Sequence, residues 1–144
     1  MLCHLARQNP QWERIEAQEA LVTFQGPHDY ISPSWYASPG VPTWNYQVVH
    51  VYGTCRSIHS VDELKAVVER LTQNYEGKFR SPWVPQYSEA ILKGIVGVEI
   101  SVTEIQCKFK LNQNRSEQDR ARVVAALDEL GSVGLATAMR ENEL

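Results

Sequence analysis

Alternating hydrophobic and polar positions predict β-strands in three stretches of the chain. Residues 43–53 (TWNYQVVHVYG) alternate in this way and continue to Ile58, after a glycine suited to a bulge. Residues 95–111 show the same period of two. Residues 19–25 are rich in Leu, Val, Thr and Phe and precede the turn-like cluster 26–29 (GPHD), so a hairpin returning through Tyr30–Ser32 is expected.

A period of 3.6 residues replaces this alternation in two places and predicts amphipathic helices. From Ser60, a predicted N-cap with Glu63 as its capping-box partner, an apolar stripe runs over residues 61–71. A second helix is predicted over residues 117–130, with Ser116 as its N-cap and a stop at Gly131. Shorter helices are expected at residues 8–17 and 86–93, and a frayed helical tail at residues 132–144.

The segment between the first two strand regions is a predicted loop. Residues 32–42 (SPSWYASPGVP) contain prolines at positions that exclude a central strand or a helix interior. Strand-rich stretches with interspersed helices, without a repeated βαβ pattern, predict an α+β fold around an antiparallel sheet or barrel. We expect one domain, 1–144, with a C-terminal helical part at about 116–144.

Length and charge narrow the class of protein. A chain of 144 residues with 43% hydrophobic and 22% charged residues is typical of one folded domain and not of a disordered chain. The formal net charge of −3 disfavours avid nonspecific binding to nucleic acid, although a local basic patch remains open. The sequence lacks a membrane-span pattern and its start lacks signal-peptide features, so a cytoplasmic location without membrane association is predicted.

The reactive side chains point to no catalytic or metal site. The three cysteines, Cys3, Cys55 and Cys107, have neither disulfide-framework nor zinc spacing and are expected to be buried or half-buried free thiols. The four histidines lack the short spacing of a metal-binding helix, and nucleophile motifs are absent from the sequence. We therefore predict no catalytic residue and no metal ligand from spacing alone.

Three clusters combine aromatic with polar or cationic side chains near predicted strand ends. They are residues 32–36 (SPSWY), 42–46 (PTWNY) and 108–115 (KFKLNQNR). Flat rings can cover a planar cofactor, while hydroxyl, amide and cationic groups bind phosphate and carbonyl oxygens, so the clusters have the chemistry of a flavin or nucleotide pocket. The alternative is that the aromatics fill the core or a dimer contact and that Lys108 and Lys110 form a solvated strand face.

His4 and Arg7 form a separate candidate. Both precede Asn9-Pro10, a predicted helix start where positive charge and free N–H groups can hold an anion. An ordinary surface pair is the alternative, and the residues alone favour it.

Taken together, these clusters resemble the PaiB family, described as FMN-binding negative transcriptional regulators. The residues that carry the resemblance are FQGPH at 24–28, YISPSWY at 30–36, VPTWNY at 41–46, IVGVEI at 95–100 and KFKL-x-QNR at 108–115. The motifs extend along nearly the whole chain.

The resemblance implies a split β-barrel related to pyridoxamine-phosphate oxidases and flavin reductases, an FMN cofactor and a homodimer with flavin near the subunit interface. It also implies that this chain lacks the family's N-terminal strands, so that the barrel and the flavin site are incomplete. The matching positions for FMN contacts are His4, Arg7, Ser32, Ser34, Trp35, Thr43, Trp44, Asn45, Lys108, Lys110, Gln113 and Arg115.

Three functions remain open at this point. The first is a repressor of the PaiB type, acting on DNA directly or through a partner, although charge does not support direct contact. The second is a flavin-dependent oxidoreductase of unknown substrate, because the related barrel hosts many enzymes. The third is a shortened interaction module without cofactor.

Overall fold

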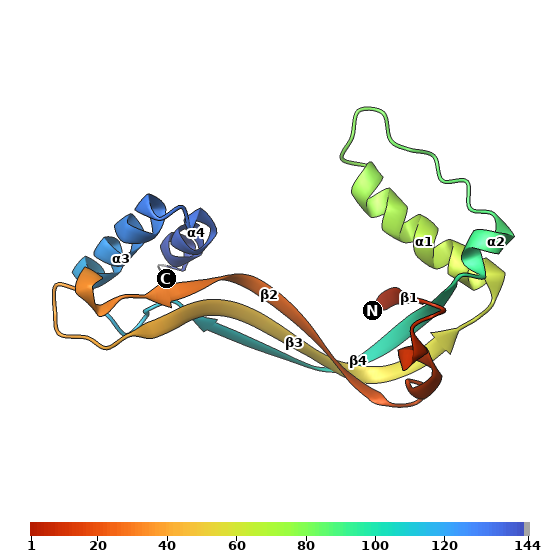
Figure 1. Ribbon diagram of the computed structural model, residues 1–144, viewed down its shortest axis with the longest axis horizontal. Helices are drawn as coiled ribbons and strands as arrows, with labels where there is room; N and C mark the ends of the chain where they lie inside the picture. The colour runs from red at the N-terminus through yellow and green to blue at the C-terminus, as the bar shows by residue number, and fades with distance from the viewer. Residues whose placement is uncertain (143–144) are drawn as a thin grey trace. The chain divides into compact units, whose positions relative to one another are not determined.

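A computed structural model describes residues 1–142 and shows an α+β protein (Figure 1). Its strands are β1 (Leu2–Ala6), β2 (Glu19–Ile31), β3 (Thr43–Ile58) and β4 (Ile95–Lys110). Its α-helices are α1 (Val61–Glu76), α2 (Glu89–Leu92), α3 (Glu117–Glu129) and α4 (Val133–Glu141), and two 3-10 helices, η1 and η2, cover Pro10–Arg14 and Pro33–Trp35. Within these residues we find no helix with the length and apolar character needed to cross a membrane.

The four strands form one sheet in the order β1-β4-β3-β2. β1 pairs with β4 in antiparallel register, with Leu2 opposite Glu99 and His4 opposite Gly97. The arrows of β2, β3 and β4 alternate in direction (Figure 1). The predicted α+β class and antiparallel sheet are therefore confirmed.

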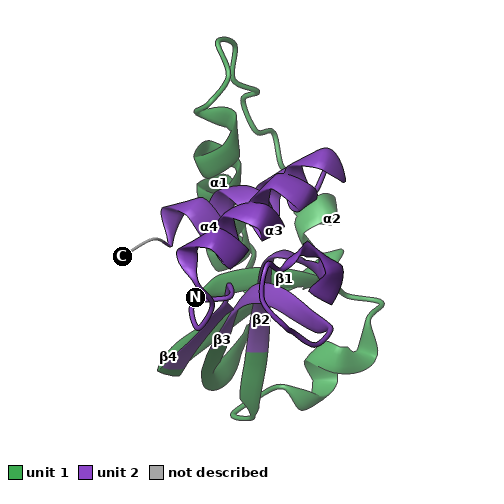
Figure 2. Ribbon diagram, turned by 90° about the vertical axis from the view of Figure 1, so that its left-hand side faces the viewer, with its two compact units in different colours: residues 1–21, 51–104 green, residues 22–50, 105–144 purple. Residues whose placement is uncertain are grey.

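The chain divides into two compact units, which are coloured separately in Figure 2. Unit 1 comprises residues 1–21 and 51–104, and unit 2 comprises residues 22–50 and 105–144. In unit 1, the apolar face of α1 buries Leu64, Val67 and Val68 against Ile58 of β3 and Leu92 of α2. This is the stripe that the 3.6-residue period predicts, and it anchors α1.

The core of unit 2 forms where α3 and α4 meet the ends of β2 and β4. Val123 and Leu127 of α3 are fully buried and cluster with Ile31 and Leu111. The same cluster contains Leu135, Ala136, Ala138 and Met139 of α4. The helix predicted from residue 132 is therefore confirmed over α4, but the prediction that it is frayed is wrong, because α4 supplies four core side chains; residues 143 and 144 lie outside the described part.

The predicted hairpin at residues 26–29 is also wrong, because β2 runs unbroken from Glu19 to Ile31. Pro27 lacks the N–H group that a central strand needs, but β2 is the last strand in the sheet order and has a strand neighbour on one side only among residues 1–142. A proline on a sheet edge interrupts no ladder, so the Gly-Pro pair does not have to form a turn.

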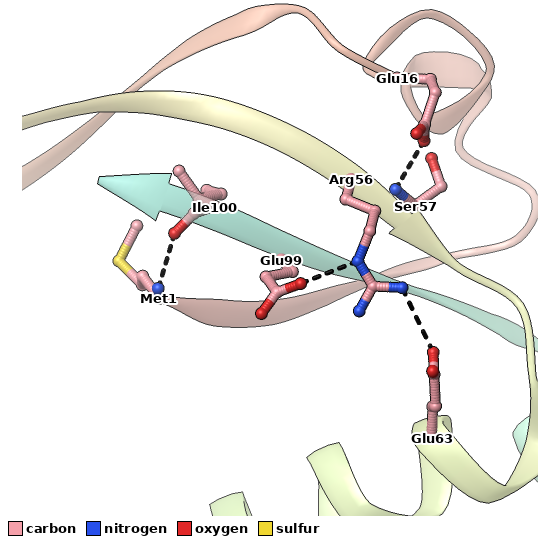
Figure 3. A network of polar contacts seen from close by, with 7 residues as sticks. All are labelled: Met1, Glu16, Arg56, Ser57, Glu63, Glu99 and Ile100. Carbon is pink, nitrogen blue, oxygen red and sulfur yellow. Dashed lines mark hydrogen bonds and ion pairs between the residues drawn. The ribbon is translucent and has the colours of Figure 1, made fainter. Parts of the chain in front are cut away.

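The helix boundaries lie close to those predicted from the sequence, but the caps and lengths of some helices differ. α1 and α3 begin where predicted, but the Ser60 side chain makes no capping bond. The carboxylate of Glu63 instead lies 3.5 Å from Arg56, so the predicted capping box is not formed (Figure 3). The helix expected over residues 8–17 is the short 3-10 helix η1, capped by Asn9 as predicted, and α2 occupies only part of residues 86–93.

Two of the three cysteines are more exposed than predicted. Cys55 is buried as expected, but Cys3 and Cys107 are exposed, and all three are free. Cys107 lies on the part of β4 where side chains are open to solvent, and Cys3 lies on β1, a strand that the sequence pattern did not predict.

Candidate functional site

The ends of β3 and β4 in unit 2 bring two predicted site residues into direct contact. The ammonium group of Lys110 donates hydrogen bonds to Oγ1 of Thr43 and, at 3.1 Å, to the carbonyl oxygen of Trp44. Strand pairing alone places these residues together, although 67 positions separate Lys110 from Thr43. A cation beside a hydroxyl group is a suitable pair for a phosphate oxygen.

An aromatic surface adjoins this pair. The Trp44 ring stacks on His28 with centroids 5.8 Å apart and an interplanar angle of 29°. Nε1 of Trp44 donates to Nδ1 of His28 at 3.3 Å. Trp44 nevertheless keeps 47% of its surface exposed, which leaves ring area for a planar ligand.

His28 is a member of this site that sequence analysis missed. It belongs to the GPH motif, but the predicted turn there gave no reason to place it beside Trp44. Because β2 continues through Pro27, His28 becomes a strand residue that can contact a residue of β3. We name the set His28, Thr43, Trp44 and Lys110 the strand-end cluster.

Ser32, Ser34 and Trp35 lie in the turn that follows β2. Ser32 caps η2, accepting a hydrogen bond from the Ser34 backbone N–H, and the two hydroxyl groups lie 2.7 Å apart. Trp35 is partly buried against the core of unit 2. The turn therefore offers two adjacent hydroxyl groups, while its tryptophan packs inward.

Three other predicted site residues lie on or next to β3 and β4, and two of them make hydrogen bonds within the fold. The Asn45 side chain is completely buried, with its Nδ2 3.6 Å from Sδ of Met139. Gln113 accepts a bond from the Leu111 N–H and donates to the Phe109 carbonyl, which fixes the end of β4. Lys108 is exposed, two residues from Lys110 on the same strand.

Arg115 packs on the loop between β2 and β3. Its guanidinium carbon lies 4.2 Å from the centre of the Tyr36 ring, and its Nη1 donates to the Pro39 carbonyl at 3.1 Å. A Cβ atom at Gly40 would lie 2.4 Å from the Tyr36 ring, so only glycine fits this close approach. Arg115 therefore helps to hold the loop that leads into Thr43.

His4 and Arg7 belong to unit 1, whereas the other ten predicted residues belong to unit 2. Arg7 donates from Nε to the Lys93 carbonyl at 2.7 Å and from Nη2 to the Ile95 carbonyl at 3.0 Å. Its guanidinium also lies 5.8 Å from the centre of the Trp12 ring. These contacts join the N-terminal segment to the start of β4.

Asp119 is a structural residue of unit 2 whose role the sequence did not reveal. It is 1% exposed, and its carboxylate accepts bonds from the N–H groups of Ala37 (2.6 Å) and Ser38 (3.3 Å) and from the Ser38 hydroxyl (2.5 Å). The Ser38 hydroxyl is the main cause of a lowered Asp119 pKa, with further lowering by the backbone bonds and by Arg115. Asp119 thus ties α3 to the loop that contains Gly40.

We expect the substitution Asp119→Asn to lower the melting temperature at neutral pH by on the order of 5 °C. Because the pKa is lowered on folding, the ionised carboxylate stabilises the protein above the unfolded-state value of about 4, and this contribution is lost as the pH falls below it. Thermal unfolding from pH 7 to pH 3 should show the variant and the native protein converging at acid pH. The exposed Asp62→Asn is the control, and a gap that is constant with pH would contradict the prediction.

Within residues 1–142, no group of three or more His, Cys, Asp or Glu side chains could hold a metal ion. The strand-end cluster contains a cation, a hydroxyl group and aromatic rings, which are groups that bind organic anions. Its composition therefore suits a phosphorylated aromatic ligand.

The antiparallel sheet with its flanking helices places the chain among α+β proteins of the split-barrel class. A family model described as "Putative FMN-binding domain" matches residues 1–104. The chain belongs to this family, the PaiB family, as the motifs had indicated.

Two relatives show the extent of the similarity. "Protease synthase and sporulation protein PAI 2" of Bacillus subtilis is 45% identical over 130 residues, covering 86% of this chain and 62% of the relative. An uncharacterised protein of Emericella nidulans is 32% identical over 166 residues, and the alignment covers 90% of this chain and 66% of that protein. The chain thus spans slightly less than two thirds of the length of these relatives.

Solved structures support the fold class. The flavocytochrome Anf3 from Azotobacter vinelandii matches with a TM-score of 0.57 over 83% of this chain and 55% of that protein. The identity is 15%, so this similarity concerns the fold alone.

Proposed function

We propose that this protein is an FMN-binding negative transcriptional regulator of the PaiB type. The observation that carries the proposal is the strand-end cluster, where Lys110, Thr43 and Trp44 come together in a chain of the FMN-binding-domain family. The similarity to PAI 2, a protein named for protease synthesis and sporulation, supports a regulatory role.

The residues of the cluster fit the parts of FMN. The Lys110 ammonium and the Thr43 hydroxyl would bind the phosphate, and the exposed Trp44 ring would cover the flavin ring. Ser32 and Ser34 add hydroxyl groups near the end of β2. When bound, FMN supplies a redox-active ring system.

The regulator proposed here is a cytoplasmic homodimer whose chains each form one domain over residues 1–144. A net charge of −3 provides no general attraction to DNA, so repression through a protein partner fits the chain better than direct contact. Several large apolar side chains on the strands of unit 2 remain 43–60% exposed, and this supports association with another subunit: they include Phe24, Tyr30, Trp44, Ile105 and Phe109.

A flavin-retention experiment tests the proposal. The purified protein is incubated with FMN, desalted, and measured for flavin absorbance between about 370 and 450 nm. We expect retained flavin in a ratio of about one per chain. Absence of flavin bands after desalting would contradict the proposal and favour an interaction module without cofactor.

A second measurement separates the regulator from an enzyme. The flavin-loaded protein is mixed with reduced nicotinamide cofactor, and nicotinamide oxidation is followed in air. A regulator should hold flavin without sustained turnover. Steady turnover would favour the oxidoreductase instead.

A further inference from the structure

The segment 77–88, which connects α1 to α2, presents large apolar side chains to solvent. Its ribbon arches past the end of α1, away from the sheet (Figure 1, Figure 2). Phe79, Trp83 and Val84 are 61%, 53% and 73% exposed, and Tyr75, in the last turn of α1, is 60% exposed. All four lie within residues 75–84. Exposed apolar side chains that gather in this way mark interaction sites.

Hydrogen bonds hold this segment against α1, although its side chains are exposed. The Trp83 N–H donates to Oε2 of Glu76 at 2.6 Å, and the Phe79 N–H donates to the Glu76 carbonyl at 2.9 Å. The hydroxyl groups of Tyr87 and Thr72 lie 2.6 Å apart. The Tyr87 and Trp83 rings meet edge to face, with centroids 5.8 Å apart. A segment fixed in this way loses little conformational entropy when a ligand covers it, which favours binding.

The charged side chains of this segment are all positive. Residues 77–88 (GKFRSPWVPQYS) include Lys78 and Arg80, both exposed, and neither Asp nor Glu, although the whole chain has a net charge of −3. The neighbouring Glu76 carboxylate already accepts the Trp83 N–H. Nζ of Lys78 lies 5.3 Å from the centre of the exposed Tyr75 ring, so a cation and an apolar surface adjoin. The segment therefore complements a ligand that combines negative charge with apolar groups.

We name this set of two cations and four large apolar residues the arch patch: Tyr75, Lys78, Phe79, Arg80, Trp83 and Val84. Its composition fits a protein segment better than nucleic acid. Affinity for nucleic acid comes mainly from several phosphate contacts, and the arch patch has only two cations. Aromatic anchors contribute most of the binding free energy in protein interfaces, while charges select the partner.

We propose that the arch patch is a docking surface for an acidic segment of a partner protein, in which carboxylates are interspersed with large apolar side chains. The apolar side chains of this segment pack on Phe79, Trp83 and Val84, and its carboxylates pair with Lys78 and Arg80. The inference rests on the proposed regulator in that it names the surface for its protein partner. It uses residues of unit 1 only, whereas the strand-end cluster belongs to unit 2.

Binding of a defined peptide tests the proposal. The probe is a fluorescein-labelled peptide of about twelve residues, half of them glutamate and half leucine or phenylalanine. Its fluorescence anisotropy is measured while the full chain is added. We expect saturable binding with a Kd below about 100 μM at low salt, weakened at least about 3-fold in about 0.5 M salt, because salt screens the ion pairs. Failure to saturate at about 500 μM protein would overturn the proposal.

Phe79→Ser tests the apolar part of the arch patch. This variant should bind the peptide at least about 10-fold more weakly, because it removes an aromatic anchor. Ile91→Ser is the matched control, since Ile91 is 59% exposed and lies on α2, outside the arch patch. It should bind as the native protein does. Equal affinity of Phe79→Ser and the native protein, or an equal loss in both variants, would overturn the proposal.

The double variant Lys78→Gln with Arg80→Gln tests the charged part. It should bind the peptide about 3- to 10-fold more weakly at low salt and lose the dependence on salt, because exposed ion pairs make modest, screened contributions. Lys65→Gln, which removes a cation elsewhere on α1, should keep the native affinity and salt dependence. A double variant with the salt dependence of the native protein would overturn the proposal, which commits to an acidic partner.

Two other probes separate the alternative partners. Labelled single-stranded oligothymidine and vesicles of phosphatidylglycerol should not bind at protein concentrations that saturate the peptide. Binding of either probe that is lost in Phe79→Ser would overturn the proposal in favour of a nucleic-acid or membrane surface. Flavin retention is measured on the same preparations. Retained flavin without peptide binding would overturn the docking surface alone, and peptide binding without retained flavin would overturn the flavin proposal alone.

Discussion

Lys110→Met is expected to weaken flavin binding by about 10- to 100-fold. The substitution keeps the length of the side chain but removes the ammonium group that meets Thr43 and the Trp44 carbonyl at the strand-end cluster. Hydrogen bonds to charged groups contribute about 1.5–3 kcal/mol, and this range corresponds to the expected loss. A titration of FMN with the protein, in which the quenching of flavin fluorescence reports binding, measures the dissociation constant directly.

Two variants make this result interpretable. Lys65→Met removes the same charge from α1 in unit 1, where Lys65 forms an exposed ion pair with Glu69, and should bind flavin as the native protein does. Lys110→Arg keeps the charge and should retain more affinity than Lys110→Met. Equal affinity of Lys110→Met and the native protein, with unchanged circular dichroism, would remove Lys110 from the flavin site.

The elements that the sequence predicted well are those whose period repeats several times. β3, β4, α1 and α3 each carry a long pattern of one period, so local propensity and burial agree. β1 has only five residues and no alternation, and its strand conformation comes from pairing with β4, whose residues lie far away in the sequence, as for Leu2 and Glu99. Such pairing leaves no signal in the five residues themselves.

The errors at β2 and α4 have the same kind of cause. A Gly-Pro pair predicts a turn unless the strand lies at a sheet edge, and edge position is a property of the assembled sheet. The small residues of α4 gave no strong stripe, yet Ala136 and Ala138 are buried because α4 packs closely on α3. Tertiary packing decides both cases.

The candidate site was predictable in residue type but not in arrangement. The motifs named Thr43, Trp44 and Lys110 by their chemistry, and the structure brings these three together. It also shows that Asn45 is buried against α4, an orientation that the motif could not give. Chemistry can be read from a motif, but the direction of each side chain depends on strand twist and on the helices that cover the sheet.

The two compact units raise the question of whether the chain unfolds as one domain. Leu127 in unit 2 and Leu64 in unit 1 are at most 1% exposed, and each belongs to the core of its own unit. We expect Leu127→Ala and Leu64→Ala each to destabilise the protein by about 3 kcal/mol, and to lower the melting temperature by about 10 °C, because each leaves a cavity. Scanning calorimetry measures both effects, with the 69% exposed Leu130→Ala as a control expected within about 0.5 kcal/mol of the native protein.

The number of transitions decides the domain question. If residues 1–144 form one cooperative domain, as proposed, the native protein shows one transition and both core substitutions shift it as a whole. Three strands favour this outcome, because β2, β3 and β4 each contribute residues to both units without a chain break. Two transitions, each moved by only one of the substitutions, would contradict the single-domain proposal, since each core would then unfold without the other.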